Sequence, residues 1–359
     1  MLKNIFISAG DVSSDFHAAN LVRAIRQENP EVSVAALGGR NLSAVSDNFV
    51  ADICELSGFG FFAPVRLYFL LREIFEKTKR EWDERKPDKI ILVDYYGFNI
   101  HLAKEAFSRK IPVYYYVSPQ VWASRKGRIK KLARYVKKML VILPFEEDIY
   151  KKAGLDTVFV GHPLLDVIKE DDLKNDGETV PLIGLFPGSR SSVVKRHLPI
   201  LEKAAEIINN KIQANFRIVV PEPSGYRGFS KYPLIKSDNF SERAKLTLAI
   251  TTSGTVSLEN ALLGIPMLVF YKLSWFNYLL ARVLVRVKYI AMANILSGKE
   301  LVPELIQSRA NPEEIAEKAV SMIVSKDYLK SVKVELAALR KKLGNPGVSQ
   351  RTAKLIMEG

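Results

Sequence analysis

The sequence lacks the features that mark several large classes of protein. Cys54 is the single cysteine among 359 residues, so no disulfide can form within the chain, which fits a reducing compartment. No apolar run reaches the roughly 20 residues that a membrane-spanning helix needs. The N-terminal residues Met1–Ile5 carry no secretory signal and lead directly into an apolar segment. We therefore expect a protein of the cytoplasm or of the cytoplasmic membrane face.

Several sequence motifs of common enzyme classes are also missing. The chain contains neither the phosphate-binding pattern GxxxxGK[ST] nor the dinucleotide pattern GxGxxG, and it has no GxSxG turn for a serine nucleophile. The 4 histidines show no metal-ligand spacing: His17, His101, His162 and His197. We expect no metal and no bound cofactor.

Acidic residues are absent from two long stretches, 122–145 and 260–299, and the chain as a whole carries a net charge of +14. The first stretch is rich in basic residues such as Arg128 and Lys131, and the second mixes basic residues with large apolar ones such as Trp275 and Tyr278. This mixture suits an anionic membrane surface or a lipid phosphate. Nucleic acid is the rival partner for any basic patch, and a solvated helix face is the plainest interpretation.

Strand-like and helix-like segments alternate along the whole chain. The apolar segments Leu2–Ser8, Val32–Leu37, Lys89–Val93 and Val113–Val117 read as strands. Between them lie helical patterns, of which 64–85 is the longest. Because the strands are uniformly apolar, we expect parallel sheets covered by helices on both faces, an α/β fold.

A charged segment, 168–180, divides the chain into two halves with the same alternation. We expect a first domain over residues 1–167 and a second over 181–342, with a charged helical tail from Pro312 to Lys342. The remaining residues, 343–359, are expected to pack back on the first domain. Two doubly wound domains with a cleft between them would bind ligands at the carboxyl ends of their strands.

Two loops of the second half have the residue types of an anion site. Gly188, Ser189 and Arg190 follow one apolar run, and Ser253, Gly254 and Thr255 follow another. Where a strand ends and a helix begins, free backbone N–H groups and the helix dipole favour a phosphate. Glu259, one helical turn later, can accept a hydrogen bond from a sugar hydroxyl. Together they predict a nucleoside diphosphate site, although each loop alone is also typical of a structural turn.

Carboxylates follow two strands of the first half. Asp94 comes directly after the strand 89–93 and is followed by Tyr95 and Tyr96. At this position it can act as a general base or cap the next helix. Asp11 and Asp15 lie in the first strand-to-helix turn. We interpret Asp15 as a helix cap and Asp11 as a residue that can face the cleft.

An unusually apolar segment precedes and enters the helix expected at 64–85. Its large side chains are Phe59, Phe61, Phe62, Leu67, Phe69 and Leu70. A buried core is the usual destination of such a cluster. The glycines before it and the arginines beside it favour an acyl-chain groove or a surface that dips into a membrane.

Many blocks of the sequence, in order, resemble those of the lipid-A-disaccharide synthase family of GT-B type glycosyltransferases. The similarity covers nearly the whole chain, and the blocks that carry it are 115–123 (YYVSPQVWA), 127–129 (GRI), 143–146 (LPFE), 159–164 (FVGHPL), 187–190 (PGSR), 253–255 (SGT) with 258–259 (LE), 294–296 (NIL) and 298–305 (GKELVPEL). The resemblance implies a GT-B-like fold of two Rossmann-like domains.

The resemblance also implies a reaction. Members transfer 2,3-diacylglucosamine from UDP to the 6-hydroxyl of 2,3-diacylglucosamine 1-phosphate, with inversion and without a metal, giving a β-1,6-linked disaccharide and UDP. It implies that Asp94 is the general base, that Arg190 and the N–H groups of Ser253–Thr255 hold the diphosphate, and that Glu259 binds the ribose. Asn294 would line the donor site. On the acceptor side the candidates are Asp11, Ser13, Asn99, Ser118 and Trp122.

The chain departs from the family pattern in its first half. The family has Asp-x-Pro-Asp-Phe-Asn where this chain has Tyr96 for the proline and Gly97 for the second aspartate. In the first turn Asp11 replaces a glutamate and Ser14 a glycine. These changes leave open another acceptor, or a UDP-hexosamine epimerase or hydrolase on the same fold. A non-enzymatic binder of anionic membrane or RNA is the least favoured alternative. The implied partners are the two acylated sugars and an anionic membrane surface, not nucleic acid, and a homodimer stays open.

Overall fold

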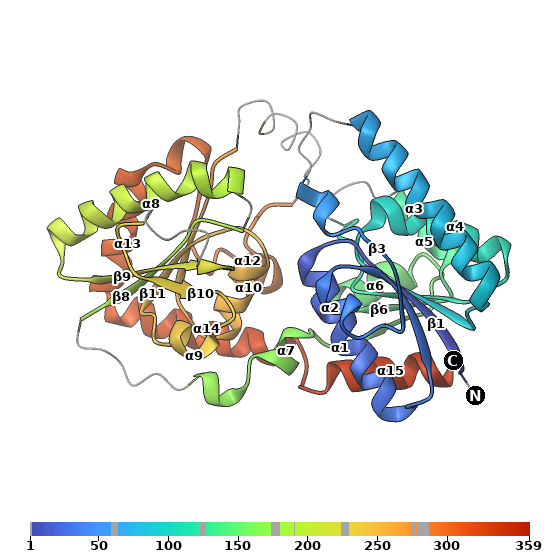
Figure 1. The fold of residues 1–359 in the computed structure, drawn as a ribbon. Helices are drawn as coiled ribbons and strands as arrows, with labels where there is room; N and C mark the ends of the chain where they lie inside the picture. Colours follow the sequence, from blue (N-terminus) through green and yellow to red (C-terminus); the bar gives the residue numbers. More distant parts are fainter. Residues whose placement is uncertain are drawn as a thin grey trace. The chain divides into compact units, whose positions relative to one another are not determined.

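The computed structural model describes residues 2–58, 64–122, 127–173, 180–189, 191–223, 230–273, 278 and 287–359. Arg190, Phe59, Phe61 and Phe62 lie outside the described residues, as do 123–126 and most of 274–286 from the two basic stretches. The chain divides into two compact units (Figure 1), one of Met1–Asp166 with Leu343–Gly359 and one of Val167–Lys342.

The first unit is built on a seven-stranded sheet in the order β3-β2-β1-β4-β5-β6-β7. Every pair of neighbouring strands is parallel. The strands are β1 (Asn4–Ala9), β2 (Ser33–Gly38), β3 (Asn48–Asp52), β4 (Lys89–Val93), β5 (Val113–Tyr116), β6 (Lys138–Val141) and β7 (Thr157–Phe159). The order reverses between β1 and β4, so the carboxyl ends of these two strands form the switch point at which such sheets bind ligands.

Helices cover both faces of this sheet (Figure 1). On one face Phe6 of β1 meets Trp82 edge-on at 5.3 Å between ring centroids, and Leu92 and Tyr115 join the same buried cluster. On the other face α15 packs against α1. The helices of the unit are α1 (Val12–Glu28), α2 (Arg40–Ser43), α3 (Pro64–Arg85), α4 (Tyr96–Ser108), α5 (Arg128–Tyr135), α6 (Pro144–Lys151), α7 (Leu164–Val167), whose last residue belongs to the second unit, and α15 (Val348–Glu358), with the 3₁₀ turn η1 (Glu55–Gly58).

The second unit has a six-stranded sheet in the order β10-β9-β8-β11-β12-β13, again with all pairs parallel. Its strands are β8 (Leu182–Phe186), β9 (Asn215–Val220), β10 (Leu234–Lys236), β11 (Leu248–Thr252), β12 (Met267–Tyr271) and β13 (Glu304–Ile306). Here the order reverses between β8 and β11, and the two loops predicted to bind phosphate follow these strands.

The helices of the second unit enclose its sheet in the same way. They are α8 (Ser191–Lys211), α9 (Phe240–Ala244), α10 (Thr255–Leu262), α12 (Met292–Ser297), α13 (Pro312–Val324) and α14 (Lys326–Lys342), with 3₁₀ turns η2 (Glu170–Leu173) and η4 (Gln307–Arg309). Two of them, α8 and α13, pack together over one buried cluster of the sheet. The predicted α/β class with two parallel-sheet units is confirmed, while the expected tail at 312–342 is two helices that part at Ser325.

Candidate functional site

Asp94 stands at the carboxyl end of β4, beside the switch point of the first sheet. Asp94 and Tyr95 adopt left-handed backbone conformations, with φ of 46° and 44°. Such conformations cost side chains other than glycine on the order of 1–3 kcal/mol each. The Asp94 N–H donates to the carbonyls of Tyr116 (3.2 Å) and Val117 (3.1 Å), which ties the turn to the end of β5. The turn prevents α4 from starting at once and holds the carboxylate at the sheet edge.

A buried polar group stabilises this strained turn. The Asn99 amide, with no exposed surface, donates to the carbonyls of Val93 (3.2 Å) and Asp94 (3.0 Å) and accepts from the Ser8 hydroxyl at 2.8 Å. The Tyr115 hydroxyl also donates to the Asp94 carbonyl. Asn99, expected on the acceptor side, therefore uses its amide to hold the backbone at Asp94 and acts as a positioning residue.

Gly10 brings the first strand-to-helix turn against the same site. A Cβ atom at Gly10 would lie 2.0 Å from Cγ of Tyr95, so the Tyr95 ring can rest there only because residue 10 is glycine. The contact joins the turn after β1 to the turn after β4. It brings the candidate residues of both turns to one place.

The Asp94 carboxyl has the proton affinity of a general base working near neutral pH. Burial raises its pKa, the nearby Asp11 charge adds to that effect, and a hydrogen bond from the Tyr95 N–H opposes it, leaving a pKa of about 7. Burial disfavours the charged form of a carboxyl, and a second negative charge does the same. A base with a pKa near the working pH transfers protons efficiently.

Asp11, rather than Asp15, caps the first helix. Asp11 is the N-cap of α1 and accepts from the N–H and hydroxyl of Ser14. Asp15 is buried one turn inside the helix, where it accepts from the N–H groups of Gly39 (2.7 Å) and Asn41 (2.9 Å) and so holds the turn after β2. Ser13, in the first turn of α1, is exposed. The interpretation of Asp15 as the cap of its own helix was wrong, because the residue before the helix already caps it.

A buried carboxyl that the sequence did not single out lies after β6. Glu146 is 1% exposed and accepts from Trp122 Nε1 (2.9 Å) and from the Leu143 N–H (3.2 Å). Burial raises its pKa to about 7 against these hydrogen bonds, and the Asp94 charge contributes to the rise. The Trp122 and Phe145 rings meet edge-on, with 4.9 Å between their centroids. Ser118, which comes shortly before Trp122 in the sequence, is also buried. Trp122 is thus fixed in position rather than free to turn.

The two phosphate-type loops of the second unit follow adjacent strands. Leu185 of β8 pairs with Ile250 of β11, so the loops after the two strands lie at the same edge. Gly188 has φ of 112° and Gly254 has φ of 149°, conformations that favour glycine. Ser189, Gly254 and Thr255 are exposed, whereas the Ser253 hydroxyl donates to the Ile290 carbonyl at 2.7 Å. The N-cap residue of α10 is Gly254, which has no side chain to bond the first N–H groups of the helix.

Glu259 is held by a buried arginine that sequence reasoning missed. Arg243 has no exposed surface, and its Nη1 lies 2.6 Å from Glu259 Oε2 while its Nη2 donates to Asn260 Oδ1 at 2.7 Å. The Glu259 side chain keeps 15% of its surface exposed. The pair fixes the carboxylate in the second turn of α10. A lone arginine in a polar stretch gave no signal of this role.

Asn294, predicted to line the donor site, uses its side chain within the protein. It has no exposed surface, its amide donates to the Val302 carbonyl and to Glu304, both at 2.8 Å, and its oxygen accepts from the Leu301 and Val302 N–H groups. Every hydrogen-bonding position of the amide is taken. Asn294 therefore secures the turn between α12 and β13 and has no polar atom left for a ligand.

The predicted acyl-binding residues that are described divide between core and surface. Leu67 and Leu70 pack against the buried cluster under α3, whereas Phe69 is 59% exposed beside Tyr68, with the two rings 5.7 Å apart. Among the described helices none is long and apolar enough to cross a bilayer. Within the described ranges no group of three or more histidine, cysteine or acidic residues could hold a metal ion.

The arrangement of two all-parallel α/β units, each with ligand-type turns at its switch point, defines the GT-B class, and solved structures share it. UDP-GlcNAc 2-epimerase from Neisseria meningitidis, bound to UDP-GlcNAc, superposes with a TM-score of 0.67 at 11% identity, covering 100% of both chains. MurG of Acinetobacter baumannii gives 0.63 at 16% identity, over 99% of this chain and 100% of that one. At these identities the likeness concerns the fold alone.

Sequence relatives are more specific. A family model described as Lipid-A-disaccharide synthetase matches residues 5–357, and the chain belongs to this family. The lipid-A-disaccharide synthase of Syntrophus aciditrophicus (strain SB) is 38% identical, over 99% of this chain and 97% of that protein. That of Trichlorobacter lovleyi is 34% identical with the same coverage.

Proposed function

We propose that this protein transfers 2,3-diacylglucosamine from its UDP conjugate to the 6-hydroxyl of 2,3-diacylglucosamine 1-phosphate, forming the β-1,6-linked disaccharide of lipid A and releasing UDP. The observation that carries the proposal is the family match over residues 5–357. It is a glycosyltransferase reaction, and the GT-B fold agrees with it. UDP-sugar and glycolipid are its two substrates.

In this proposal Asp94 takes the proton of the acceptor 6-hydroxyl as that oxygen attacks the anomeric carbon. The attack breaks the bond to UDP and inverts the configuration. A pKa of about 7 and a turn held by Asn99 support the role of general base. The geometry of the turn keeps the carboxylate at the sheet edge while its own backbone stays fixed.

The donor half of the proposal rests on the turns after β8 and β11. The uncapped N–H groups at the start of α10 suit the diphosphate and would stabilise negative charge on the leaving UDP, together with Arg190. Glu259, fixed by Arg243, would accept from the ribose. We expect no metal ion in this step.

Contact with the inner face of the cytoplasmic membrane is part of the proposal, because both substrates carry acyl chains. Exposed Tyr68 and Phe69 on α3 and the net charge of +14 support a peripheral attachment to an anionic surface. We expect nucleic acid to play no part. A homodimer is compatible with the proposal and is not required by it.

The test is UDP release from UDP-2,3-diacylglucosamine in detergent, with and without the monosaccharide 1-phosphate. We expect acceptor-dependent release and a disaccharide product. Asp94→Asn should lose transfer by at least about 100-fold, the scale of a lost general base, and keep UDP affinity. Acceptor-independent release of free sugar would instead favour a hydrolase or epimerase. Equal transfer by Asp94→Asn and the parent would remove Asp94 from the mechanism.

A further inference from the structure

A groove with basic walls lies beside the Asp94 turn, between the first turns of α4 and α5. It has a volume of about 480 Å³, and its lining includes Tyr96, Gly97, His101, Gly127, Arg128 and Lys131. The two helices pack against each other, so the groove is formed by elements of one unit. Among the described residues that line it, none is acidic.

Arg128 is held in a fixed position in this groove. Its guanidinium carbon lies 4.4 Å from the centroid of the Tyr96 ring, a cation–π contact that leaves the N–H groups at the edge of the guanidinium available. Among described residues, no ion pair engages Arg128 or Lys131. A guanidinium presented in this way binds the oxygens of a phosphate in pairs.

The backbone around the groove adds to its positive potential. The N-cap residues of α4 and α5, Tyr95 and Gly127, make no side-chain capping bond, and the positive ends of both helix dipoles lie beside the groove. Gly97 is exposed, and a Cβ atom at this position would meet nothing within 4 Å. The groove is therefore open at the point where residue 97 would otherwise project a side chain.

From these observations we infer that the groove binds the 1-phosphate of the sugar acceptor, with Arg128 as its main ligand and Lys131 as a second cation. The inference rests on the function proposed above. Tyr96 is two residues from Asp94, which limits their Cα separation to about 7 Å. Because the 6-hydroxyl and the 1-phosphate belong to one sugar ring, a phosphate in this groove leaves the hydroxyl within reach of Asp94. The site would thus select a phosphorylated acceptor over a second, unphosphorylated glycolipid.

The test compares two acceptors, 2,3-diacylglucosamine 1-phosphate and the same sugar without phosphate, using the full chain. We expect Arg128→Gln to lower kcat/KM for the phosphorylated acceptor by about 10- to 100-fold, the scale of a lost hydrogen bond to a charged group. It should change kcat/KM for the unphosphorylated sugar and KM for the donor by no more than about twofold.

Lys130→Gln is the matched control, since Lys130 is an exposed cation of α5 that does not line the groove. It should leave both kcat/KM values within about twofold of the parent. Equal losses on both acceptors with Arg128→Gln, or no loss on either, would overturn the inference. So would a parent that does not discriminate between them.

Two further binding measurements distinguish this inference from the alternatives. Binding of each glycolipid in detergent micelles is measured without donor; a parent that binds the phosphorylated sugar more tightly, and an Arg128→Gln variant that does not, support the site even if no disaccharide forms. Binding to phosphatidylglycerol vesicles is measured as well. If Arg128→Gln weakens vesicle binding and leaves acceptor discrimination intact, the groove serves a lipid headgroup and the inference is wrong.

Discussion

Asp94 combines a costly backbone with a shifted proton affinity. Its left-handed conformation persists because Asn99 and Tyr115 both bond its carbonyl and because its N–H is held by the end of β5. The carboxylate itself accepts a backbone N–H bond from Tyr95 that lowers its pKa. The surrounding groups thus fix the position of the residue but stabilise its negative charge less than burial destabilises it. That division suits a base that must bind and release a proton.

The Asp11 charge offers a way to test this at the level of one residue. It raises the pKa of Asp94, so Asp11→Asn should lower that pKa. Only the deprotonated Asp94 is active as a base, so kcat/KM should fall below about pH 7 in the parent. In Asp11→Asn the same fall should begin at lower pH. A pH profile of kcat/KM from pH 5 to 9 for parent and variant checks the shift.

The substitution keeps the fold because asparagine is as good an N-cap as aspartate. Asp47→Asn serves as the control, since Asp47 pairs with Arg26 at the surface and does not figure among the causes of the Asp94 shift. Its profile should match that of the parent. An acid limb that stays in place in Asp11→Asn, or moves to higher pH, would contradict the assignment of that limb to Asp94.

At the scale of an element, the turn into α10 has the backbone features predicted for a phosphate-binding loop. Gly254 has φ of 149° with open space around its Cα, so its substitution meets conformational strain and no clash. Gly254→Ala should destabilise the second unit by about 1–3 kcal/mol. It should also weaken UDP binding by about tenfold or more, because the N–H groups at the start of α10 would turn away from the phosphate. Calorimetry with UDP checks the affinity.

Gly264 supplies the matched comparison at the other end of the same helix. It also has positive φ, 69°, and open space. Gly264→Ala should cost about 1 kcal/mol of stability and leave UDP affinity unchanged. Similar losses of UDP affinity in the two variants would mean that general destabilisation, rather than the phosphate-type turn, explains the effect.

The length and apolar pattern of each element decided whether the sequence could predict it. The helix 64–85 and the central strand 89–93 were predicted with the bounds that the structure has, because each is long or uniformly apolar. The strands β3, β10 and β13 were missed, and all three lie at sheet edges. An edge strand has one neighbour and is partly exposed, so its sequence shows little apolar pattern. The end helix α15 was missed for a similar reason, since it is short and half polar.

Candidate site residues could be predicted from the sequence where they follow the end of a strand. They could not be predicted where their place in the site depends on burial. Asp94 and the turns at Gly188 and Gly254 follow strand ends, which the apolar pattern reveals. The burial of Glu146 and Arg243 depends on packing between distant segments, which no local pattern records. Asn294 has the polar side chain of a ligand residue, but tertiary contacts use all of it. The functional roles of all these site residues stay predictions.

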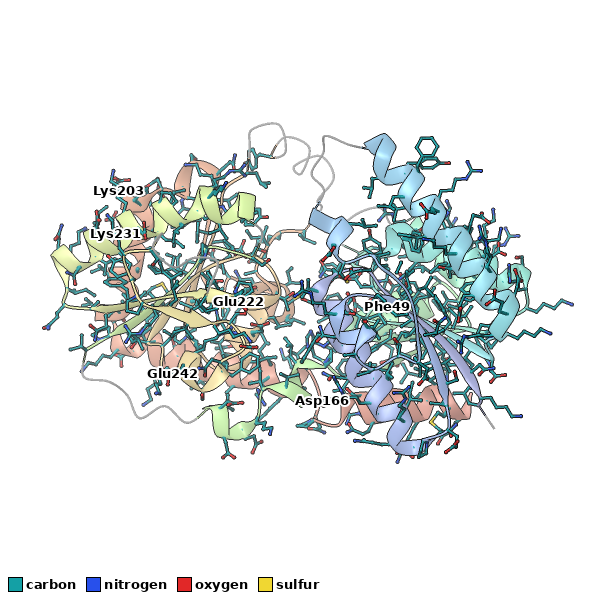
Figure 2. All side chains as sticks on the ribbon, in the orientation of Figure 1. Phe49, Asp166, Lys203, Glu222, Lys231 and Glu242 are labelled. Atoms are coloured by element: carbon teal, nitrogen blue, oxygen red, sulfur yellow. The ribbon has the colours of Figure 1, made fainter. Side chains whose placement is uncertain are left out.

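At the scale of the whole molecule, the chain leaves the first unit at Asp166 and returns at Leu343. The returning helix α15 is held at both ends. Asp166, labelled in Figure 2, accepts from the N–H groups of Gly347, Val348 and Ser349 at 2.7–2.9 Å. At the other end Lys89 and Lys137 donate to carbonyls of the last residues. An acid at the start and lysines at the end complement the dipole of the helix.

This clamp predicts that Asp166 stabilises the first unit through α15. Asp166→Ala removes a side chain that accepts three N–H bonds and the Ser349 hydroxyl, so we expect a loss of about 1–2 kcal/mol, the upper range for an N-cap. In a unit of this size that loss lowers Tm by about 2–8 °C. Differential scanning calorimetry, which resolves the two units when they melt separately, is the measurement.

Asp172→Ala is the control, since Asp172 also accepts a backbone N–H, that of Lys169, but in an exposed turn of the second unit. It should change the melting of neither unit by more than about 1 °C. Asp166→Ala should in addition speed proteolytic cleavage near residue 345, because α15 detaches from α1 more often when its N-terminus is uncapped. If Asp166→Ala and Asp172→Ala melt alike and resist protease alike, then α15 is held by its apolar face against α1, and the polar clamp adds nothing measurable to the stability of the unit.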